Sequence, residues 1–451
     1  MKSSKIVTKV PELNQKEPSN SVEAMLLNEP EWLTKDYMEN CLRKYYKDSD
    51  LRISHFDARP ALAKGENFGG VLTRVKVDFC TAGDVCKDGN YMVKTSFECD
   101  EFAKKAMEPY DIFNREMSMY ENVLPKLNAL LQKAGDTEQL FAETLAVDTA
   151  RSALLFEDLN VRQFIMPDRI KGFDMKLAKL VLRKLAKMHA ASAVLNELEK
   201  GSLNVYDRGM FNRHTDNYAP CFVGLLEACG RLVSQWGTEF EHLARKIFDL
   251  KPMYMELAKR VFDPIEGHLN VLAHGDFWTN NVMVKYDEVS GDPIDVIIID
   301  FQYSAWGSPA IDLLYLFNTS LKEEIHLSGQ DELIQHYYKE LSDTLKKLNF
   351  KAHIPSLHNF HLQLETKSFY GMYILIGYFD YILSFYLSII AFNSTCVVQP
   401  VQRNEETEDA DFNALMKEDE RGINFKNTCY KNPYCQKMIR KLLPVEYFLK
   451  Y

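Results

Sequence analysis

Three polar residues in the second half of the chain, Asp276, Asn281 and Asp300, are of types that could carry out chemistry together. They lie within VLAHGDFWTNNVMVKYDEVSGDPIDVIIIDFQ, residues 271–302. Carboxylate and amide oxygens suit Mg²⁺, which usually takes its remaining ligands from water and phosphate. The pattern therefore indicates metal-assisted chemistry on a phosphate, provided that the fold brings the three residues together.

A β-hairpin would bring Asp276, Asn281 and Asp300 together. Strands are predicted at residues 282–286 and 294–301, because both are rich in β-branched residues and the segment between them contains turn residues. Neighbouring strands lie about 4.8 Å apart, so antiparallel pairing would place Asn281 and Asp300 at the open end, with Asp276 in the preceding loop. The alternative is that these residues only cap turns and end a strand.

Kinase-type phosphoryl transfer uses this arrangement: an Asp that orients or deprotonates the attacking hydroxyl, followed by an Asn and a second Asp that hold metal ions. The sequence reads His-Gly-Asp-x4-Asn and then Ile-Asp-Phe-Gln. A protein kinase would have Arg at the position of Gly275 and Gly at the position of Gln302. These two differences, and the short run from Asp300 to the next helix, disfavour a protein kinase.

A kinase-like site also needs a Lys on a strand and a Glu on a helix. Lys94 lies within the strand-like segment YMVKTSF, where an unpaired lysine would be costly. Glu116 falls on the apolar face of a predicted helix, three residues after Phe113, and needs a cation there. We expect Lys94 and Glu116 to pair, with Glu121 as the second choice for the acidic partner.

Other segments are candidates for contact with a nucleotide. Gly65, Gly69 and Gly70 lie between two strand-like runs and could bring main-chain N–H groups close to phosphates, although they do not form a full Gly-x-Gly-x-x-Gly motif. Main-chain groups from Glu157 to Leu159 could bind adenine, whereas the Glu157 side chain could be simply solvated.

Three further residues are candidates for structural support of the site. Asp312 begins an apolar helix, where a carboxylate is either a cap or a brace for the catalytic loop. His274, beside Asp276, and His189, in a long helix, are interpreted as core or bracing residues rather than catalysts.

Composition and charge are those of a globular protein. The chain has 451 residues, of which 46% are hydrophobic, and a net charge of −10, which argues against general nucleic-acid binding. Nine scattered cysteines and an N-terminus without an apolar signal segment favour a reducing, cytoplasmic setting. Residues 369–392 are long enough to span a membrane, but Asp380 and several tyrosines favour a buried helix, so no membrane span is expected.

The order of predicted elements indicates an α+β fold with a small β-rich N-terminal part and a larger helical C-terminal part. Strands are expected within 50–80, 91–97 and 152–160, and helices at 31–48, 105–132 and 176–200. The acidic segment 404–421 is expected to be a surface loop. The expected units are a polar extension with the start of the first helix (1–35), an N-terminal nucleotide-binding lobe (36–158) and a helical catalytic and substrate lobe (159–451).

Together, HGDFWTNN, IIIDFQ, SPAIDLLYLF, FNREMSMY and LLFEDL resemble the ecdysteroid kinase-like family of arthropods, which belongs with the choline kinase-like and aminoglycoside phosphotransferase-like kinases. The resemblance covers about residues 40–400. It implies a protein kinase-like two-lobed fold that uses ATP and Mg²⁺. It also implies Asp276 as catalytic base, Asn281 and Asp300 as metal ligands, and Lys94, paired with Glu116, as the phosphate-binding residue.

The resemblance implies phosphorylation of a hydroxyl on an ecdysteroid or a related foreign compound, with a detoxifying role in the second case. We expect a monomer whose partner is this small molecule. Aromatic residues make up 12% of the chain and could wall an apolar pocket, or simply fill the helical core. The alternative function is a catalytically silent protein that binds nucleotide or sterol, which the presence of all five site residues disfavours.

Overall fold

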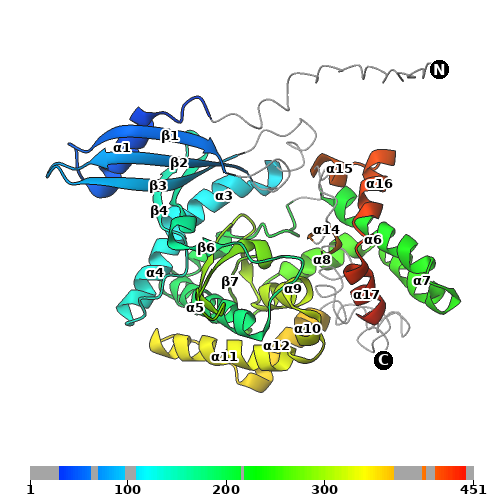
Figure 1. Cartoon of the computed structure of the whole chain (residues 1–451). Helices are drawn as coiled ribbons and strands as arrows, with labels where there is room; N and C mark the ends of the chain where they lie inside the picture. Colours follow the sequence, from blue (N-terminus) through cyan, green and yellow to red (C-terminus); the bar gives the residue numbers. More distant parts are fainter. Residues whose placement is uncertain are drawn as a thin grey trace, which may run out of the picture.

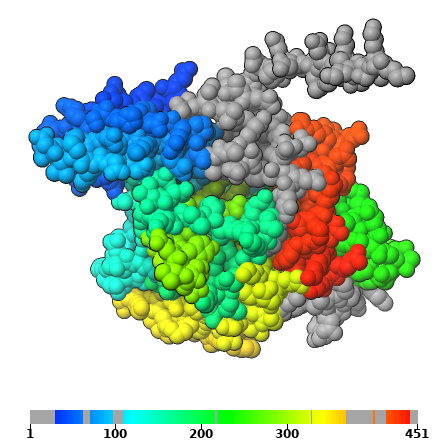
Figure 2. Space-filling view, viewed as in Figure 1, coloured from blue at the N-terminus to red at the C-terminus, as the bar shows by residue number. Residues whose placement is uncertain are grey.

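A computed structural model describes residues 30–61, 70–96, 108–214, 218–369, 399–402 and 412–442. In these residues the fold is a mixture of helix and sheet, with a sheet-rich N-terminal region and a mainly helical remainder (Figure 1). In the space-filling view the N-terminal strands, in blue, and the last helices, in orange and red, lie on opposite sides of the molecule (Figure 2).

The N-terminal region consists of one helix, a five-stranded sheet and a helical segment inserted between its third and fourth strands. Its elements are α1 (Lys35–Tyr46), β1 (Arg52–Pro60), β2 (Val71–Cys80), β3 (Cys86–Thr95), η2 (Glu108–Tyr110), α3 (Ile112–Ser118), the π-helical turn η3 (Met119–Val123), α4 (Leu124–Lys133), β4 (Thr144–Asp148) and β5 (Ala153–Glu157).

The remainder is mostly helical, with short strands near its centre. Its elements are η4 (Leu159–Arg162), β6 (Phe164–Ile165), α5 (Met175–Leu198), η5 (Ser202–Val205), α6 (Ala219–Ser234), η6 (Thr238–Phe240), α7 (Glu241–Leu250), α8 (Tyr254–Phe262), β7 (Val271–Ala273), η7 (Thr279–Asn281), β8 (Val282–Tyr286), β9 (Pro293–Ile298), β10 (Ala305–Gly307), α9 (Ala310–Ser320), α10 (Glu323–Ser328), α11 (Gln330–Lys347), α12 (Leu357–Phe369), α14 (Gln399–Gln402), α15 (Phe412–Met416), α16 (Glu420–Thr428) and α17 (Pro433–Leu442).

The large sheet is antiparallel, in the order β1-β2-β3-β5-β4. Alternate residues of β2, including Val75 and Val77, are buried in a cluster with Met38 and Leu42 of α1. Since side chains alternate across a strand, Lys94 of β3 points to the opposite face from Val93, which belongs to the α1 cluster. The sheet therefore has one face covered by α1 and carries Lys94 on the other.

One finding on the cysteines differs from the sequence interpretation. Cys80 and Cys86 lie directly opposite each other at the ends of β2 and β3, with 4.0 Å between their Cα atoms, and form a disulfide. Because Cys80 and Cys86 are paired positions on two strands joined by a short turn, their thiols meet although the sequence contains no recognisable cysteine motif. The scattered cysteines are therefore not by themselves a sign of a reducing compartment.

Of the segment predicted as one helix over 105–132, the structure describes residues from Glu108 onwards, and these form a chain of helices interrupted by a π-helical turn. Pro125 is the second residue of α4 and has no N–H group to continue the hydrogen bonds of the preceding helix. The π turn just before it accommodates this interruption. Glu116 lies on α3, upstream of the turn, and remains in a regular helix.

The helical core is built around α5, whose central residues are buried almost without interruption. In Figure 1 this helix lies between the strands β7–β9 and the helix α11. The prediction of a long helix at 176–200 is confirmed within two residues at each end. The buried face of α5 includes His189, which takes part in the site described below.

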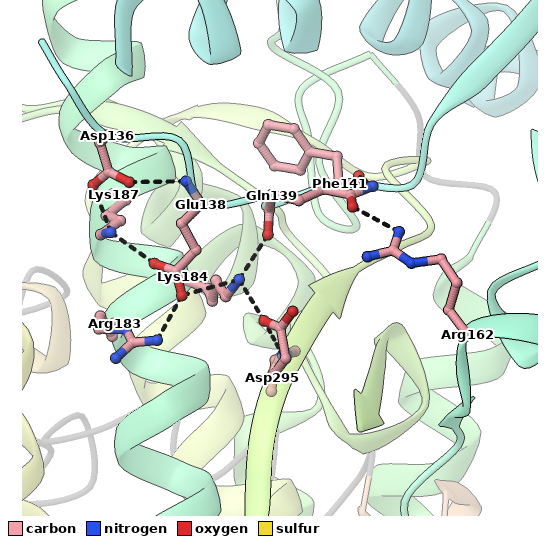
Figure 3. Close-up of polar contacts among 10 residues, drawn as sticks. Asp136, Glu138, Gln139, Phe141, Arg162, Arg183, Lys184, Lys187 and Asp295 are labelled. Carbon is pink, nitrogen blue, oxygen red and sulfur yellow. Dashed lines mark hydrogen bonds and ion pairs between the residues drawn. The ribbon is translucent and has the colours of Figure 1, made fainter. Parts of the chain in front are cut away.

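A cluster of charged residues joins α5 to the connector between α4 and β4 and to β9 (Figure 3). Lys184 of α5 is fully buried, and its Nζ donates to the main-chain oxygen of Gln139 at 2.6 Å. It also pairs with Asp295 of β9 at 2.7 Å and with Glu138 of the connector at 3.1 Å. Because β9 leads directly to Asp300, this cluster helps to fix the position of that residue.

Glu138→Gln is expected to destabilise the fold in a pH-dependent manner. Burial alone would raise the pKa of Glu138, but Lys187, Lys184 and Arg183 outweigh it and lower the pKa to about 2 from 4.5. A lowered folded pKa gives stability that is complete above the unfolded pKa and is lost as the pH falls towards 2. The free energy of unfolding of wild type should exceed that of the variant by about 1–3 kcal/mol at pH 7. This difference should shrink below about pH 4.5, as measured by urea unfolding from pH 7 to 3.5.

Glu332→Gln is the matched control. Glu332 of α11 pairs with Lys179 of α5, and the two side chains are 59% and 35% exposed. Exposed ion pairs contribute about 0–1 kcal/mol, so the control should show little change at any pH. A stability difference for Glu138→Gln that stays constant with pH would contradict the assignment.

Two other sequence predictions concern the C-terminal part. The expectation of a surface loop at 404–421 is wrong for residues 412–416, which form α15 and bury Leu415 and Met416 because this short stretch is apolar. It is also wrong for residues 420–421, which begin α16, and residues 404–411 lie outside the described residues. The apolar segment 369–392 lies almost entirely outside the described residues. Among the helices that the structure does describe, none is both long and apolar enough to cross a membrane.

Candidate active site

The predicted hairpin is present. Val282 of β8 pairs with Ile298 of β9, and the main-chain N–H of Ile299 donates to the oxygen of Asn281 at 3.0 Å. This register places Asn281 opposite Ile299 at the open end, one residue from Asp300, as the pairing predicted. Asp276 lies in the loop between β7 and η7.

Asp300 has a backbone conformation that sequence analysis did not predict. The strand β9 ends at Ile298, and Asp300 adopts the left-handed region with φ = 67°. This conformation costs a non-glycine residue roughly 1–2 kcal/mol. Strain of this kind is concentrated at functional sites, where the surrounding structure holds the residue.

Lys94 bridges two carboxylates from distant parts of the chain. Its Nζ lies 2.8 Å from Oε2 of Glu116 and 3.2 Å from Oδ1 of Asp300. Lys94 and Glu116 are buried, whereas the side chain of Asp300 is 26% exposed. The predicted Lys94–Glu116 pair is therefore present, and Glu121, the second choice, is exposed on the π turn.

Burial and charge act against each other in this group. Burial alone would lower the pKa of Lys94, but Asp300 and Glu116 outweigh it and raise the pKa, so Lys94 is a cation. Burial raises the pKa of Glu116 to about 7, and Lys94 acts in the opposite direction. The side-chain amide of Gln302, at the position where a protein kinase has Gly, donates to Glu116 at 3.4 Å.

The carboxylate of Asp276 is held by a separate donor on each oxygen. The Tyr315 hydroxyl donates to Oδ1 at 2.8 Å, and Nδ2 of Asn281 donates to Oδ2 at 3.1 Å. Burial raises the pKa of Asp276 to about 6, although Tyr315 and Asn281 lower it in part. A general base works best with a pKa near the working pH, and this carboxylate has such a pKa.

Asp312 braces the loop, as one of its two predicted readings required. Its carboxylate accepts from the main-chain N–H groups of His274 at 2.7 Å and Gly275 at 2.8 Å. It also bonds Nε2 of His189 at 2.9 Å, and the other ring nitrogen of His189 bonds the Tyr337 hydroxyl at 2.7 Å. His274 bonds the oxygen of Ile299 through Nε2, so both histidines support the structure around the site.

Gly275 lies where the loop that carries Asp276 passes very close to the backbone of Tyr303. Its φ is +82°, and a Cβ added there would lie 2.0 Å from the main-chain oxygen of Tyr303. Any other residue would therefore displace either the loop that carries Asp276 or the segment after Asp300. The glycine found where a protein kinase has Arg thus has a local structural cause.

Gly275→Ala is expected to destabilise the protein more than Gly291→Ala. Gly291, in the β8–β9 turn, has a similar φ of +71° but nothing within 4 Å of its added Cβ. The turn variant should cost about 1–2 kcal/mol for backbone conformation alone. Gly275→Ala should cost roughly 1–3 kcal/mol more because of overpacking, as measured by urea unfolding, and equal costs would contradict the close approach.

Of the three glycines predicted to approach phosphates, only Gly70 lies within the described residues. Gly65 and Gly69 lie outside the described residues. Gly70 lies just before β2, and a Cβ there would come within 2.8 Å of the Thr95 oxygen and 3.3 Å of Cε of Lys94. The chain thus passes close to the Lys94 side chain at a residue without a side chain of its own.

In the segment predicted to contact adenine, several polar groups of Glu157 and Asp158 already form hydrogen bonds within the protein. The main-chain N–H of Glu157 donates to Glu143, and that of Asp158 donates to Asn90. The Glu157 carboxylate accepts from Gln139 at 2.7 Å, which gives it a structural role. These bonds occupy the main-chain N–H groups of Glu157 and Asp158, and the next N–H group along the chain is that of Leu159, which begins η4.

The donor set fits Mg²⁺ bound together with a phosphate. Nδ2 of Asn281 is used by Asp276, which leaves the Oδ1 of Asn281 as a ligand atom, and the partly exposed Asp300 supplies a carboxylate oxygen. Within the described part of the chain, no three His, Cys, Asp or Glu residues gather closely enough to hold a metal ion. A site with few protein oxygens agrees with a metal that borrows ligands from phosphate and water.

Sequence analysis missed Tyr315. A tyrosine within SPAIDLLYLF is typical of a buried apolar helix, and its ring does lie in the apolar core. The available signal was its position three residues after Asp312, which places both on one face of α9. One of the two interpretations of Asp312 placed this face against the catalytic loop, and under that interpretation Tyr315 was the next side chain along the same contact.

One comparison with known proteins identifies the family of the chain. Residues 64–350 match the model of the ecdysteroid kinase-like family. The match covers more than half of the chain and includes all the site residues, so the site is of the kinase-type phosphotransferase class. The chain belongs to the ecdysteroid kinase-like family.

The other comparisons add little. No curated protein shows significant similarity to the chain. One solved structure, a glucosamine kinase in complex with glucosamine, ADP and inorganic phosphate, is 12% identical over 77% of this chain and 94% of its own, with a TM-score of 0.26. The likeness is weak, so the family membership rests on the sequence match.

Proposed function

We propose that this protein is an ATP- and Mg²⁺-dependent kinase that phosphorylates a hydroxyl of an ecdysteroid or a related hydroxylated compound. The observation that carries the proposal is the bridge from Lys94 to Glu116 and Asp300, next to the Asp276–Asn281 pair. It joins residues 206 positions apart into one polar group. We further propose a two-lobed, protein kinase-like organisation with a boundary near residue 158.

In the proposed reaction the acceptor oxygen attacks the γ-phosphorus of ATP. The bond between this phosphorus and the oxygen that bridges to the β-phosphate breaks, and ADP leaves. Asp276 takes the proton of the acceptor hydroxyl, and Lys94 holds the phosphates by charge. The products are ADP and the phosphate ester, and the proton on Asp276 then passes to water.

Asn281 and Asp300 would hold Mg²⁺ in this scheme. When bound, the metal supplies positive charge that neutralises the phosphate oxygens. The protein contributes rigidity: the β8–β9 register sets the separation of the two ligands, and the Lys184 cluster fixes β9 to α5.

The acceptor class is supported by the residues near Asp276. Trp278 and Tyr303 are partly exposed and pack against an apolar cluster that includes Tyr218 and Phe211. The hydroxyl groups of Tyr303 and Tyr218 lie 3.0 Å apart. Aromatic faces with a few polar groups suit a large apolar molecule that carries hydroxyls, such as a steroid.

The test is a screen of acceptors with the purified full-length protein. Ecdysone, other hydroxylated steroids, and plant and synthetic alcohols and phenols are incubated with Mg·ATP, with ADP release and product mass as readouts. We expect at least one compound to stimulate ADP release and to gain one phosphoryl group. If none does, while ATP still raises the melting temperature, the protein is instead a silent nucleotide-binding relative.

A further inference from the structure

The helix α9 runs along the catalytic loop and contacts it at three places. Asp312 accepts from the main-chain N–H groups that precede Asp276, and Tyr315 bonds the Asp276 carboxylate itself. Further along, the Ser320 hydroxyl accepts from the main-chain N–H of Thr279 at 3.0 Å. Asp312 and Tyr315 are three positions apart and share one face of the helix, and Ser320 contacts the loop from the last residue of α9. One helix therefore contacts the loop from residue 274 to residue 279.

Tyr315 differs from the other two contacts because it holds a side chain and not the backbone. Its ring is only 6% exposed and is packed in the apolar cluster with Tyr218 and Leu257. A ring fixed in this way presents its hydroxyl in one direction, towards Oδ1 of Asp276. A hydrogen bond from a hydroxyl to a charged carboxylate is stronger than one between neutral groups, and this one, at 2.8 Å, has the ordinary length of an O–H···O bond.

The carboxylate needs such a restraint. The last torsion of an Asp side chain has a broad energy minimum and is not fixed by rotamer preference. Asn281 holds only Oδ2, and Nδ2 of Asn281 also donates to the Asp276 main-chain oxygen. Without a donor on Oδ1, the carboxylate could rotate about this single point, whereas two donors define its plane.

We propose that Tyr315 is a positioning residue for phosphoryl transfer, fixing the plane of the Asp276 carboxylate so that a lone pair faces the acceptor hydroxyl. The inference rests on the proposed function for its chemistry. Tyr315 acts through Asp276 and is not itself placed against the reacting atoms. An error of about 1 Å in the position of a reacting group can cost on the order of 10²-fold in rate, so loss of this one hydroxyl should be measurable.

Tyr315→Phe is the variant that tests this, because it keeps the packed ring and removes only the hydroxyl. Transfer from Mg·ATP to ecdysone, and to water as the slower acceptor, should fall by about 10–100-fold in kcat. The KM for ATP should stay within about twofold, since Tyr315 bonds Asp276, whereas Lys94, the proposed phosphate-binding residue, pairs with Glu116 and Asp300. Loss of a hydroxyl with a purely structural role would not lower kcat while leaving the KM for ATP unchanged.

Tyr430→Phe is the matched control. Tyr430 is buried in the same apolar cluster, and its hydroxyl donates to the main-chain oxygen of Leu225 at 2.7 Å. This variant should lower the melting temperature about as much as Tyr315→Phe but leave kcat within about twofold of wild type. Equal turnover of Tyr315→Phe and wild type would overturn the inference.

A crystal structure of the Tyr315→Phe protein supplies a readout that does not depend on activity. We expect the Asp276 carboxylate to rotate away from its wild-type plane, and an unchanged carboxylate would overturn the inference. Failure of the proposed function is seen separately, as a wild-type protein that transfers phosphate to none of the acceptors in the screen and not to water. In that case the crystal structures still decide whether Tyr315 positions Asp276.

Discussion

Asp276→Asn is expected to lower phosphoryl transfer by about 10²–10⁴-fold, the range for loss of a general base. The amide has almost the same shape as the carboxylate but cannot take the proton of the acceptor hydroxyl. The stability of the fold should change little, because the remaining oxygen can still accept from Tyr315. ADP release in the presence of an acceptor measures the effect.

Nucleotide binding separates this prediction from general damage to the site. Lys94 pairs with Glu116 and Asp300 rather than with Asp276, so the rise in melting temperature caused by Mg·ATP should be retained in the variant. Asp292→Asn is the control, because Asp292 lies in the same hairpin but forms an exposed pair with Lys176. Wild-type turnover in the Asp276→Asn protein would rule out the proposed mechanism.

The parts of the site that sequence could predict are those set by local rules. The hairpin follows from two β-branched runs and a turn, so the register that joins Asn281 to Ile299 was accessible. The pairing of Lys94 with Glu116 followed from the cost of burying either charge alone. Asp312 was accessible because a carboxylate at the start of a helix has few roles.

Other features depend on contacts between distant segments. The left-handed backbone of Asp300 arises where β9 ends against the rest of the site, and nothing in the Ile-Asp-Phe-Gln pattern indicates it. The need for Gly275 becomes visible only through the oxygen of Tyr303, 28 positions away. Tyr315 looks like any core aromatic residue until its hydroxyl is seen against Asp276.

The fold shows the same division. Alternating apolar residues predicted the N-terminal strands, and the long run of apolar positions predicted α5. The interruption of the helix before Pro125 and the disulfide between Cys80 and Cys86 were missed. Both depend on how two neighbouring segments are aligned, which composition and periodicity do not specify.

Lys94→Met is expected to destabilise the fold by about 3–5 kcal/mol, the cost of breaking a buried ion pair by removing one partner. Methionine keeps the volume of the aliphatic stem but leaves Glu116, which is 1% exposed, without its cation. The amide of Gln302, at 3.4 Å, is a weak replacement. Urea unfolding measures the loss, and Lys126→Met, which breaks an exposed pair with Glu199, should cost no more than about 1 kcal/mol.

The double variant Lys94→Met with Glu116→Gln separates the stability of this pair from its proposed role in catalysis. Removing the charge of Glu116 leaves no fully buried carboxylate without a cation, and Asp300, whose side chain is 26% exposed, keeps contact with solvent. The double variant should therefore recover most of the stability that Lys94→Met loses. Its phosphoryl transfer should stay as low as that of the single variant, because no cation remains on β3 to hold the phosphates. If the two stability losses simply add, the buried pair is not coupled. If the recovered protein transfers phosphate at the wild-type rate, Lys94 has a structural role alone.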